Sequence, residues 1–340
     1  MSVKLTFDLR PDVKLGFHIS KEKTLEKSFN DMLHTPLKSY QIYICNARAF
    51  NPPKTTTDDM KKTLHTLERH KKYACVHGNL LYNLCGSVTH REDSNFQKKL
   101  ETTCAGVTAE LDIAAGFGSG VVVHFGTCKD KKKGIFTMGK AIEGVLKNNS
   151  PTTKTIAKDL SKDLAEFKKS RKLILENSAG EGSKLGSNLQ EIAEIINSVD
   201  EGVRDQIKVC IDTAHIFGAG QYDFGSKKSV VKFFEDFDSI VGKERLELFH
   251  LNDSRVAWGS KKDRHENIGL GYIFGDRGGE DPGEGMDGLK KLIEIAEERK
   301  VPLIGEPPAK TKEGDIAPGG IWDYTVINEL CKLKEDHFYC

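Results

Sequence analysis

Residues 208–215, Lys-Val-Cys-Ile-Asp-Thr-Ala-His, join a short apolar run to a polar segment that carries Asp212 and His215. Short runs of apolar and β-branched residues are typical of buried strands. The chain contains eight such runs, and the sequence between neighbouring runs is long enough for a helix. They lie at 13–17, 40–45, 73–76, 120–123, 172–175, 208–211, 246–249 and 301–304.

The segments between these runs are polar and carry apolar residues three or four positions apart, as in Leu189, Ile192 and Ile196. This spacing is typical of amphipathic helices. Strands that alternate with helices imply parallel pairing with right-handed crossovers, and eight such units predict an α/β fold, a single (β/α)8 TIM barrel. An open doubly wound sheet is the alternative. We expect one domain over 1–340, with its core at about 13–335.

Two stretches at predicted strand-to-helix connections, 129–134 and 272–285, are rich in charge, glycine or proline. We expect them to be loop insertions, because barrels carry their functional loops at these connections. Residues 116–120, Gly-Phe-Gly-Ser-Gly, are similar to a nucleotide-binding loop. They precede a strand, whereas a phosphate-binding loop follows one, so the sequence predicts a turn there.

Composition excludes several classes of protein. The chain is 38% hydrophobic and 30% charged, and it has no apolar run long enough to cross a membrane. Its first residues lack the pattern of a secretory signal, so we expect a soluble intracellular protein in the cytoplasm, the nucleus or a viral replication compartment. The eight cysteines include no CxxC pair, which favours reduced thiols over disulfides or a thiolate zinc site.

The net charge of +1 does not indicate a protein that is basic overall. Contact with a polyanion would therefore depend on local basic patches, each of which by itself is more typical of a solvated loop. The lysine- and arginine-rich patches are 70–72, 129 with 131–133, 227–228, and 261–262 with Arg264.

Seven of the eight apolar runs are followed, directly or after one glycine, by histidine or by a carboxylate residue. In a barrel these positions share one mouth, the face at which active sites are built. An aspartate there also fits a helix N-cap, and a buried histidine also fits a hydrogen-bonded core position. An unpaired glutamate after an apolar run needs a cationic partner, and a metal ion supplies one. The residues are His18, His77, His124, Glu176, Asp212, His250 and Glu306.

Two local spacings strengthen the prediction of a metal site. Asp212 and His215 are three positions apart, so one helical turn places both on the same face. Asp263 and His265 are two apart, so an extended segment does the same. Five imidazoles and four carboxylates without a thiolate suit zinc, with manganese as a substitute. The candidate ligands are His77, His124, Glu176, Asp212, His215, His250, Asp263, His265 and Glu306.

Nine ligands exceed the needs of one metal ion or of a simple pair. Three ions would use them if one carboxylate bridges and water fills the open positions. Clustered divalent ions suit phosphodiester hydrolysis, because they stabilise both the crowded phosphoryl oxygens and the departing alkoxide. The sequence therefore predicts a phosphate ester as substrate.

Nine dispersed segments resemble the endonuclease IV family, zinc-dependent apurinic/apyrimidinic endonucleases built on a xylose-isomerase-like barrel. They occur in the family's order and cover about residues 13–306. The segments are Gly16–Ser20, Asn46–Arg48, Val76–Gly78, Val123–Gly126, Leu175–Gly182, Cys210–His215, Phe249–Asp253, Asp263–His265 and Ile304–Glu306.

The resemblance implies three zinc ions per chain. It assigns His77 and His124 to one zinc, with Glu176 bridging to a second. The ligands that it adds to the second zinc are Asp212, His250 and Glu306, and those of the third are His215, Asp263 and His265. It gives Glu176 and Glu306 a catalytic role beside the attacking water. It also implies incision 5′ to an abasic site in double-stranded DNA by a monomer, leaving a 3′-hydroxyl and a 5′-deoxyribose phosphate.

Further residues match family positions that are not ligands. His18, Asn252 and Asp253 are expected behind the ligands or facing the substrate. Arg48 matches the arginine that the family inserts into the minor groove. Leu80 and Leu81 are candidate apolar wedges, although the family commonly has an aromatic residue at the position of Leu80.

Two other functions remain as alternatives. A sugar isomerase or epimerase on the same barrel would bind one metal through Glu176, Asp212, His250 and Glu306, and would leave the other five candidate ligands without a purpose. A non-catalytic protein that binds DNA lesions would not need a bridging carboxylate. The phosphodiesterase is therefore the preferred hypothesis.

Overall fold

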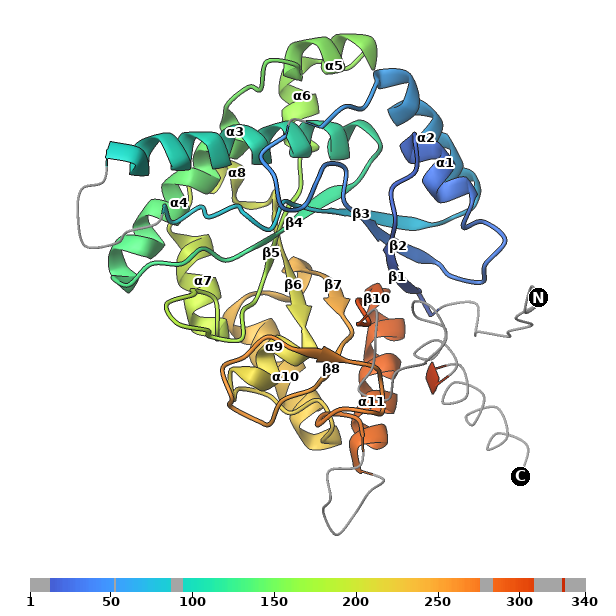
Figure 1. Ribbon diagram of the computed structural model, residues 1–340, viewed down its shortest axis with the longest axis vertical. Helices are drawn as coiled ribbons and strands as arrows, with labels where there is room; N and C mark the ends of the chain where they lie inside the picture. Colours follow the sequence, from blue (N-terminus) through green and yellow to red (C-terminus); the bar gives the residue numbers. More distant parts are fainter. Residues whose placement is uncertain (1–12, 52, 87–93, 276–283, 309–325, 328–340) are drawn as a thin grey trace.

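The computed structural model describes residues 13–51, 53–86, 94–275, 284–308 and 326–327. The predicted TIM barrel is confirmed, since eight parallel strands close in the order β1-β10-β7-β6-β5-β4-β3-β2 (Figure 1). Each strand overlaps one of the eight predicted runs, and the open doubly wound sheet is wrong. The strands are β1 (Leu15–Ile19), β2 (Ser39–Ile42), β3 (Tyr73–His77), β4 (Gly120–His124), β5 (Leu173–Glu176), β6 (Ile207–Asp212), β7 (Leu246–His250) and β10 (Leu303–Gly305).

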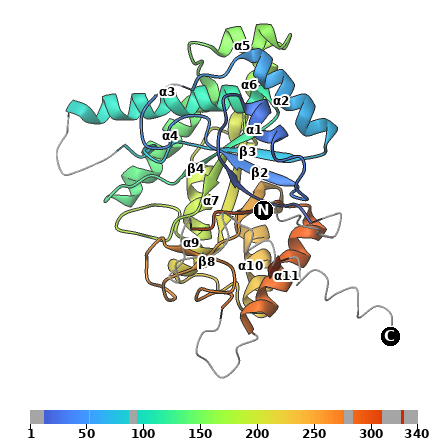
Figure 2. The same ribbon diagram turned by 45° about the vertical axis from the view of Figure 1, so that its right-hand side comes forward.

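Helices cover the outside of the barrel (Figures 1 and 2). Amphipathic α7, α10 and α11 bury their apolar faces against the strands, as the spacing of Leu189, Ile192 and Ile196 predicts. The helices are α1 (Leu25–Asn30), α2 (Thr57–Arg69), α3 (Ser94–Gly116), α4 (Lys131–Lys147), α5 (Thr153–Asp159), α6 (Leu164–Lys169), α7 (Leu189–Asn197), α8 (Glu201–Arg204), α9 (Thr213–Gly218), α10 (Lys227–Ile240) and α11 (Glu284–Arg299), with a 3-10 turn η1 (Lys243–Arg245).

The strands alternate between the barrel interior and the layer beneath the helices. Val122 packs inside the barrel, whereas its neighbours Val121 and Val123 pack with the helices. The barrel interior is filled by one buried cluster, consisting of Cys75, Val122, Ile174, Cys210, Leu248 and Ile304. Because the side-chain period of a strand is two, the residue two positions after each of these also faces inward, at the mouth.

The close approach of β1 to β2 requires a glycine at position 16. A Cβ atom there would lie 1.6 Å from the carbonyl oxygen of Ser39, which no side chain can tolerate. Gly16 is therefore needed for the backbone contact that helps to close the barrel, and it sets the register that pairs His18 with Gln41.

Two sequence expectations about connections need correction. Residues 131–134 are not part of a loop insertion but the first turn of α4, capped by Asp130, whose carboxylate accepts the backbone N–H of Lys133. In the second predicted insertion, 276–283 lie outside the described residues, and Glu284 and Gly285 begin α11. The turn predicted at 116–120 is confirmed, because α3 ends at Gly116 and β4 begins at Gly120.

A small antiparallel pair, β8 (Asp253–Ser254) and β9 (His265–Glu266), follows β7 and was not predicted. Its register pairs Ser254 with His265, which brings the segment around residue 265 back to the barrel mouth. Two-residue strands carry too little pattern to be recognised in a sequence. No helix in the described part of the chain has the length and apolar character needed to cross a membrane.

Candidate metal centre

The candidate ligands gather at the mouth because of the strand period. His77, His124 and Glu176 each follow an interior residue, Cys75, Val122 and Ile174, by two positions. Asp212, His250 and Glu306 follow interior residues of β6, β7 and β10 in the same way. The prediction differs at two strand ends. His18 lies inside β1, one residue before its end, and Glu306 comes one residue after β10.

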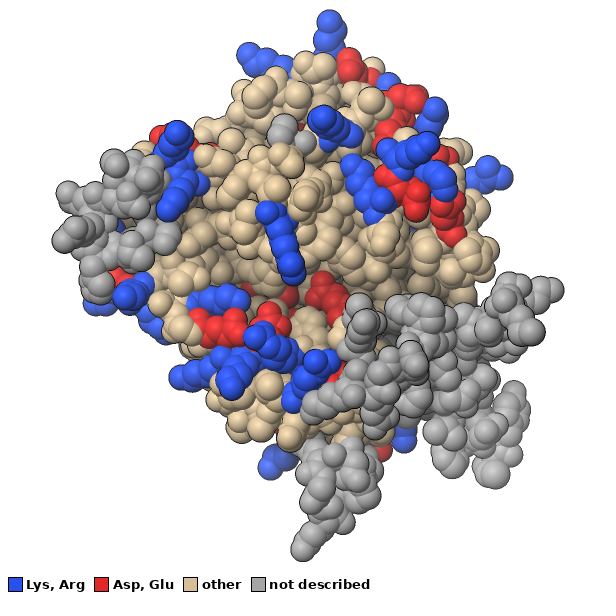
Figure 3. Space-filling view, viewed as in Figure 1, with Lys and Arg blue, Asp and Glu red and all other residues tan. Residues whose placement is uncertain are grey.

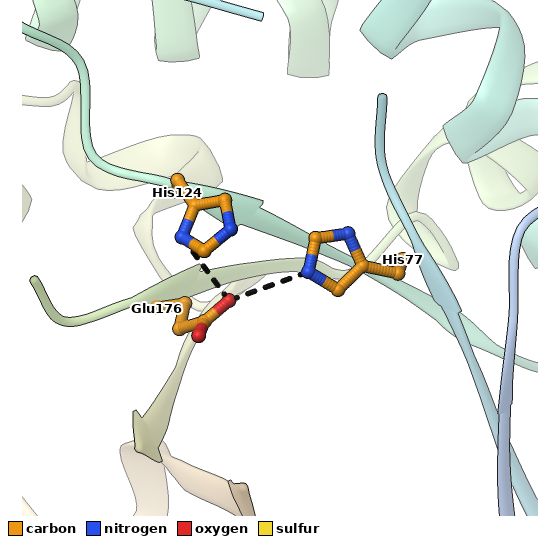
Figure 4. Close-up of side chains that lie close together, drawn as sticks. All are labelled: His77, His124 and Glu176. Atoms are coloured by element: carbon orange, nitrogen blue, oxygen red, sulfur yellow. Dashed lines mark ion pairs between the residues drawn. The ribbon is translucent and has the colours of Figure 1, made fainter. Parts of the chain in front are cut away.

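Glu176 lies at the centre of the cluster and is almost fully buried. One of its oxygens, Oε2, lies 3.3 Å from His124 Nδ1 and 3.5 Å from His77 Nε2 (Figure 4). The other, Oε1, lies 3.1 Å from His250 Nδ1 and 3.4 Å from His215 Nδ1. The two oxygens of one carboxylate thus face different sets of histidines, which is the arrangement that a bridging ligand requires.

A second part of the cluster forms around Asp263. Its two oxygens lie 3.1 Å from His215 Nε2 and 3.3 Å from His265 Nε2. Asp212 Oδ2 lies 3.4 Å from His265 Nε2, while Asp212 Oδ1 accepts the backbone N–H of His215 as the cap of α9. The N-cap reading of Asp212 and the ligand reading are therefore compatible, because each uses a different oxygen.

Potential ligand atoms fall into three groups, and the atoms of each group lie within 4.8 Å of one another. Asp263 adds its oxygens to the group around His215. All nine predicted ligands are thus brought together at one barrel mouth, and Figure 3 displays acidic side chains in a hollow of this face. The groups are His77, His124 and Glu176; Glu176, Asp212, His250 and Glu306; and Asp212, His215 and His265.

Three buried atoms of this cluster make no hydrogen bond within the described residues: Glu176 Oε2, His215 Nε2 and His265 Nε2. Buried polar atoms are normally hydrogen-bonded, and an unsatisfied buried carboxylate oxygen is costly. All three atoms point toward other potential ligands. The cluster therefore fits divalent metal ions, and its nitrogen and oxygen donors suit zinc.

The pKa values of the candidate ligands determine which of them are already in the form that binds metal. Burial pushes the pKa of Glu176 upward, but His124 and His250 outweigh burial and hold the pKa well below its ordinary value. Burial lowers the pKa of His124 to about 4, so its imidazole is neutral near pH 7. Ionised carboxylates and neutral imidazoles are the forms that bind metal. Other histidines of the cluster differ: burial works against it, but Asp212 and Asp263 raise the pKa of His215 to about 10, so metal binding there must displace a proton.

Gln41 is a residue of this centre that the sequence analysis missed. It is fully buried, and its amide nitrogen donates to Glu306 Oε1 at 2.6 Å. Its amide oxygen, which can only accept, lies 2.8 Å from His250 Nε2. The proton of His250 is therefore on Nε2, which leaves Nδ1 free to bind metal. The signal in the sequence was a polar residue at an inward position of an otherwise apolar run.

The three residues predicted behind the ligands have different surroundings. Asn252 donates to Asp212 Oδ2 at 2.7 Å and accepts the backbone N–H of Glu306 at 2.9 Å, so it positions two of the candidate ligands. His18 Nδ1 lies 3.1 Å from the amide nitrogen of Gln41. Asp253 is buried and accepts backbone N–H groups of the 269–274 segment, so its contacts support that loop rather than the ligands.

The predicted DNA contacts lie on two neighbouring loops beside the mouth. Arg48 is exposed, and Leu80 and Leu81 are 40% and 45% exposed. The N–H of Leu80 donates to the carbonyl of Ala47, which ties the loops together. Phe50, 48% exposed, was missed, and its ring lies 6.1 Å from that of Tyr82. An aromatic surface that Leu80 lacks is thus present on the adjacent loop.

Both loops are anchored on one buried carboxyl group. Glu110 on α3 accepts from Cys45 Sγ at 3.0 Å and from the hydroxyl of Tyr82 at 2.9 Å. Burial raises the pKa of Glu110 from 4.5 to about 7. Because the folded pKa exceeds the unfolded one, the unfolded chain binds fewer protons between these values. Stability therefore falls as pH rises from about 4.5 to 7.

Glu110→Gln is expected to remove this pH dependence, because it keeps the acceptor oxygen and loses the charge. The free energy of unfolding of the variant, relative to that of the original protein, should increase by up to about 3 kcal/mol as the pH rises from about 4.5 to about 8. Urea unfolding of both proteins at a series of pH values measures the difference. Parallel curves would show that Glu110 does not titrate in this range.

Comparison with known proteins gives the family. A family described as "Xylose isomerase-like TIM barrel" matches residues 45–277. A protein of Halothermothrix orenii named "Probable endonuclease 4" is 30% identical over 302 residues, covering 87% of this chain and 94% of the relative. "Apurinic-apyrimidinic endonuclease 1" of Saccharomyces cerevisiae is 24% identical over 307 residues, covering 88% and 73%.

The fold agrees with these relatives. The crystal structure of endonuclease IV from Thermus thermophilus superposes with a TM-score of 0.68 at 24% identity, and covers 95% of this chain and 99% of its own. At that identity the superposition supports the barrel alone. The family assignment rests on the matched sequence, which includes eight of the nine candidate ligands. This chain therefore belongs to the endonuclease IV family of nucleases.

Proposed function

We propose that the protein hydrolyses the phosphodiester bond 5′ to abasic sites in double-stranded DNA, leaving a 3′-hydroxyl and a 5′-deoxyribose phosphate. The observation that carries the proposal is the cluster of three donor groups around Glu176, with buried donor atoms that make no hydrogen bond among the described residues. A cluster of this size suits three zinc ions, with manganese as a substitute. When bound, such ions would stabilise negative charge on the phosphoryl oxygens and on the departing alkoxide.

The chain's own residues then have definite tasks. Glu176 Oε1 and Glu306 Oε2 lie 3.1 and 3.3 Å from the same atom, His250 Nδ1, so the two carboxylates stand on either side of it. We propose that they accept hydrogens from the attacking water and orient it for in-line attack. Gln41 and Asn252 fix the direction of Glu306, because they contact its side-chain oxygens and its backbone N–H.

Lesion recognition is assigned to the two loops beside the mouth. Exposed Leu80, Leu81 and Phe50 offer apolar surface that could enter the base stack, and Arg48 lies on the same pair of loops in position to meet phosphate or minor-groove edges. A nucleotide without a base is the easiest to extrude, since no stacking or pairing must be broken for it. We propose that these residues select abasic sites because extruding a nucleotide without a base requires less free energy than extruding one that is stacked and paired.

A sugar isomerase or epimerase is the second candidate, because Glu176, Asp212, His250 and Glu306 by themselves would hold one ion. It leaves the contacts of His215 and His265 with Asp263 without a purpose. A non-catalytic lesion-binding protein also fails to account for these buried donors. Both alternatives make different predictions in an incision assay.

The purified protein with zinc should cut a duplex that carries one abasic-site analogue at a single position, 5′ to the lesion. Labelling each strand end identifies the bond that is cut and the chemical ends produced. The same duplex with a normal base pair at that position is the control. Tight binding without incision would favour a lesion-binding protein. The absence of both binding and incision would overturn the proposed function.

A further inference from the structure

A second cavity opens beside the metal centre, with a volume of about 220 Å³. It lies between the loop after β4, the loop after β5, the end of α9 and the segment before β9. Four lysines from three of these segments line it: Lys129, Lys131, Lys184 and Lys261. We refer to this cavity as the lysine pocket. None of the predicted metal ligands lines it.

The backbone holds the segments of the lysine pocket together. Thr127 and Lys184 form an antiparallel bridge, and the N–H of Cys128 donates to the carbonyl of Ser183 at 3.0 Å. The N–H of Lys261 donates to the carbonyl of Gly218 at 2.9 Å, and Lys261 has a φ of +53°, which is uncommon for a residue other than glycine. Basic patches that are far apart in the sequence thus meet in a fixed arrangement.

The charge in the lysine pocket is only partly balanced. Lys131 lies 3.1 Å from Glu191 Oε1, and Lys184 lies 3.1 Å from Glu181 Oε2. Among the described residues, no carboxylate lies within ion-pair distance of Lys129 or Lys261. Figure 3 displays lysine and arginine side chains gathered along one side of the acidic hollow. The pocket therefore keeps a net positive charge that would favour an anion.

Backbone donors add to this preference. Gly182 and Ser183 line the pocket, and in the part of the chain that the structure describes neither N–H has an acceptor. Gly182 has a φ of +57° and open space around a Cβ atom, so glycine is required there for backbone conformation and not for room. Unpaired N–H groups next to ammonium groups are the donors that bind phosphate oxygens.

The lysine pocket is connected to the metal centre by direct contacts. Glu181, which pairs with Lys184, accepts the backbone N–H of Asp263 at 2.8 Å. Asp263 Oδ2 lies 3.1 Å from His215 Nε2. A DNA strand has one phosphate per about 3.4 Å of helix axis, so a strand held at the metal centre carries further phosphates past the neighbouring loops.

We propose that the lysine pocket binds a backbone phosphate of the incised strand, close to but distinct from the phosphate that is cleaved. This inference rests on the proposed function, because it takes the metal centre to hold the scissile phosphate. The pocket provides the local positive charge that the net charge of +1 does not. It would contribute affinity and register on the strand without reading its sequence.

Lys129→Gln and Lys261→Gln test the pocket, with Lys132→Gln as the matched control. Lys132 is exposed in the first turn of α4 and does not line the pocket. Its substitution therefore removes the same charge without removing a pocket side chain. The kcat/KM for incision is measured from 50 to 200 mM salt. Each pocket variant should lose roughly three- to tenfold near physiological salt, and its slope against log salt should be smaller by about one. Slopes equal to that of Lys132→Gln would overturn the proposal.

Replacing single DNA phosphates by uncharged groups identifies the phosphate that the lysine pocket binds. Methylphosphonates replace one phosphate at a time around the abasic site, and the scissile phosphate stays intact. At one position, neutralising the phosphate should reduce the incision rate of the original protein. The same neutralisation should reduce the rate of Lys261→Gln little further, since the two changes remove the same contact. Additive losses at every position would overturn the proposal. Failure of the unmodified protein to cut the unmodified duplex would instead overturn the proposed function.

Discussion

Glu176→Gln is expected to slow incision by at least about a thousandfold, which corresponds to about 4 kcal/mol of lost transition-state stabilisation. Glutamine has nearly the same size but carries no charge, so it can neither balance two cations nor hold an attacking water as a carboxylate does. Glu176 faces His77 and His124 with one oxygen and His250 with the other, so both sides of the cluster lose a partner. Single-turnover incision of an abasic duplex measures the effect.

The residues proposed to contact DNA are untouched by this change, so affinity for an abasic duplex should stay within about tenfold as measured by fluorescence anisotropy. Glu143→Gln is a suitable control, because Glu143 is a carboxylate on the surface of α4 that pairs with Lys140 and Lys147, away from the metal centre. It should cut at the rate of the original protein. Incision by Glu176→Gln within tenfold of that rate would rule out a catalytic role for Glu176.

Removal of metal is expected to abolish incision and to lower the melting temperature by at least about 10 °C. Each bound ion stabilises the folded state by about 4 kcal/mol when its concentration is a thousand times its dissociation constant. Without ions, Glu176 and Asp212 remain buried, with cluster atoms that lack hydrogen-bond partners in the described structure. Calorimetry before and after treatment with a chelator, and after zinc is restored, measures the change.

Metal analysis of the purified protein should find close to three zinc ions per chain. One tightly bound ion would favour the one-metal isomerase, since Glu176, Asp212, His250 and Glu306 form a complete group for a single ion. Manganese added after chelation should restore part of the incision activity, because it accepts the same oxygen and nitrogen donors. A melting temperature that does not change after chelation would contradict a structural contribution from the metals.

The sequence predicted the barrel and the positions of the candidate ligands for the same reason. Short apolar runs separated by helices leave few topologies, and inward-facing positions recur with a period of two. His77, Glu176 and His250 could therefore be assigned to one mouth before any contact was known. Asp263 and His265 were found from their own spacing, although the strand pairing that places them was not predicted.

Only the tertiary structure identified the contacts that join residues from different strands and loops. Gln41 gains its importance from the pairing of β1 with β2, which brings it against Glu306 and His250, more than 200 positions away. Glu110 reaches Cys45 and Tyr82 from the last third of a long helix, α3. A local pattern can mark Gln41 as a polar residue within an apolar run, but it does not identify the partners of such residues, because packing and not sequence neighbours sets them.

The same reason explains the basic patches. In the sequence, the lysines at 129–133 and 261–262 are ordinary charged segments with little to distinguish them from solvated loops. Barrel closure and the bridge between Thr127 and Lys184 bring the loops together, and the lysine pocket exists only because of that. The sequence by itself determined which residues face the mouth, because strand alternation is local. The folded chain decided which of the other residues share a cavity, because loop contacts form between distant segments.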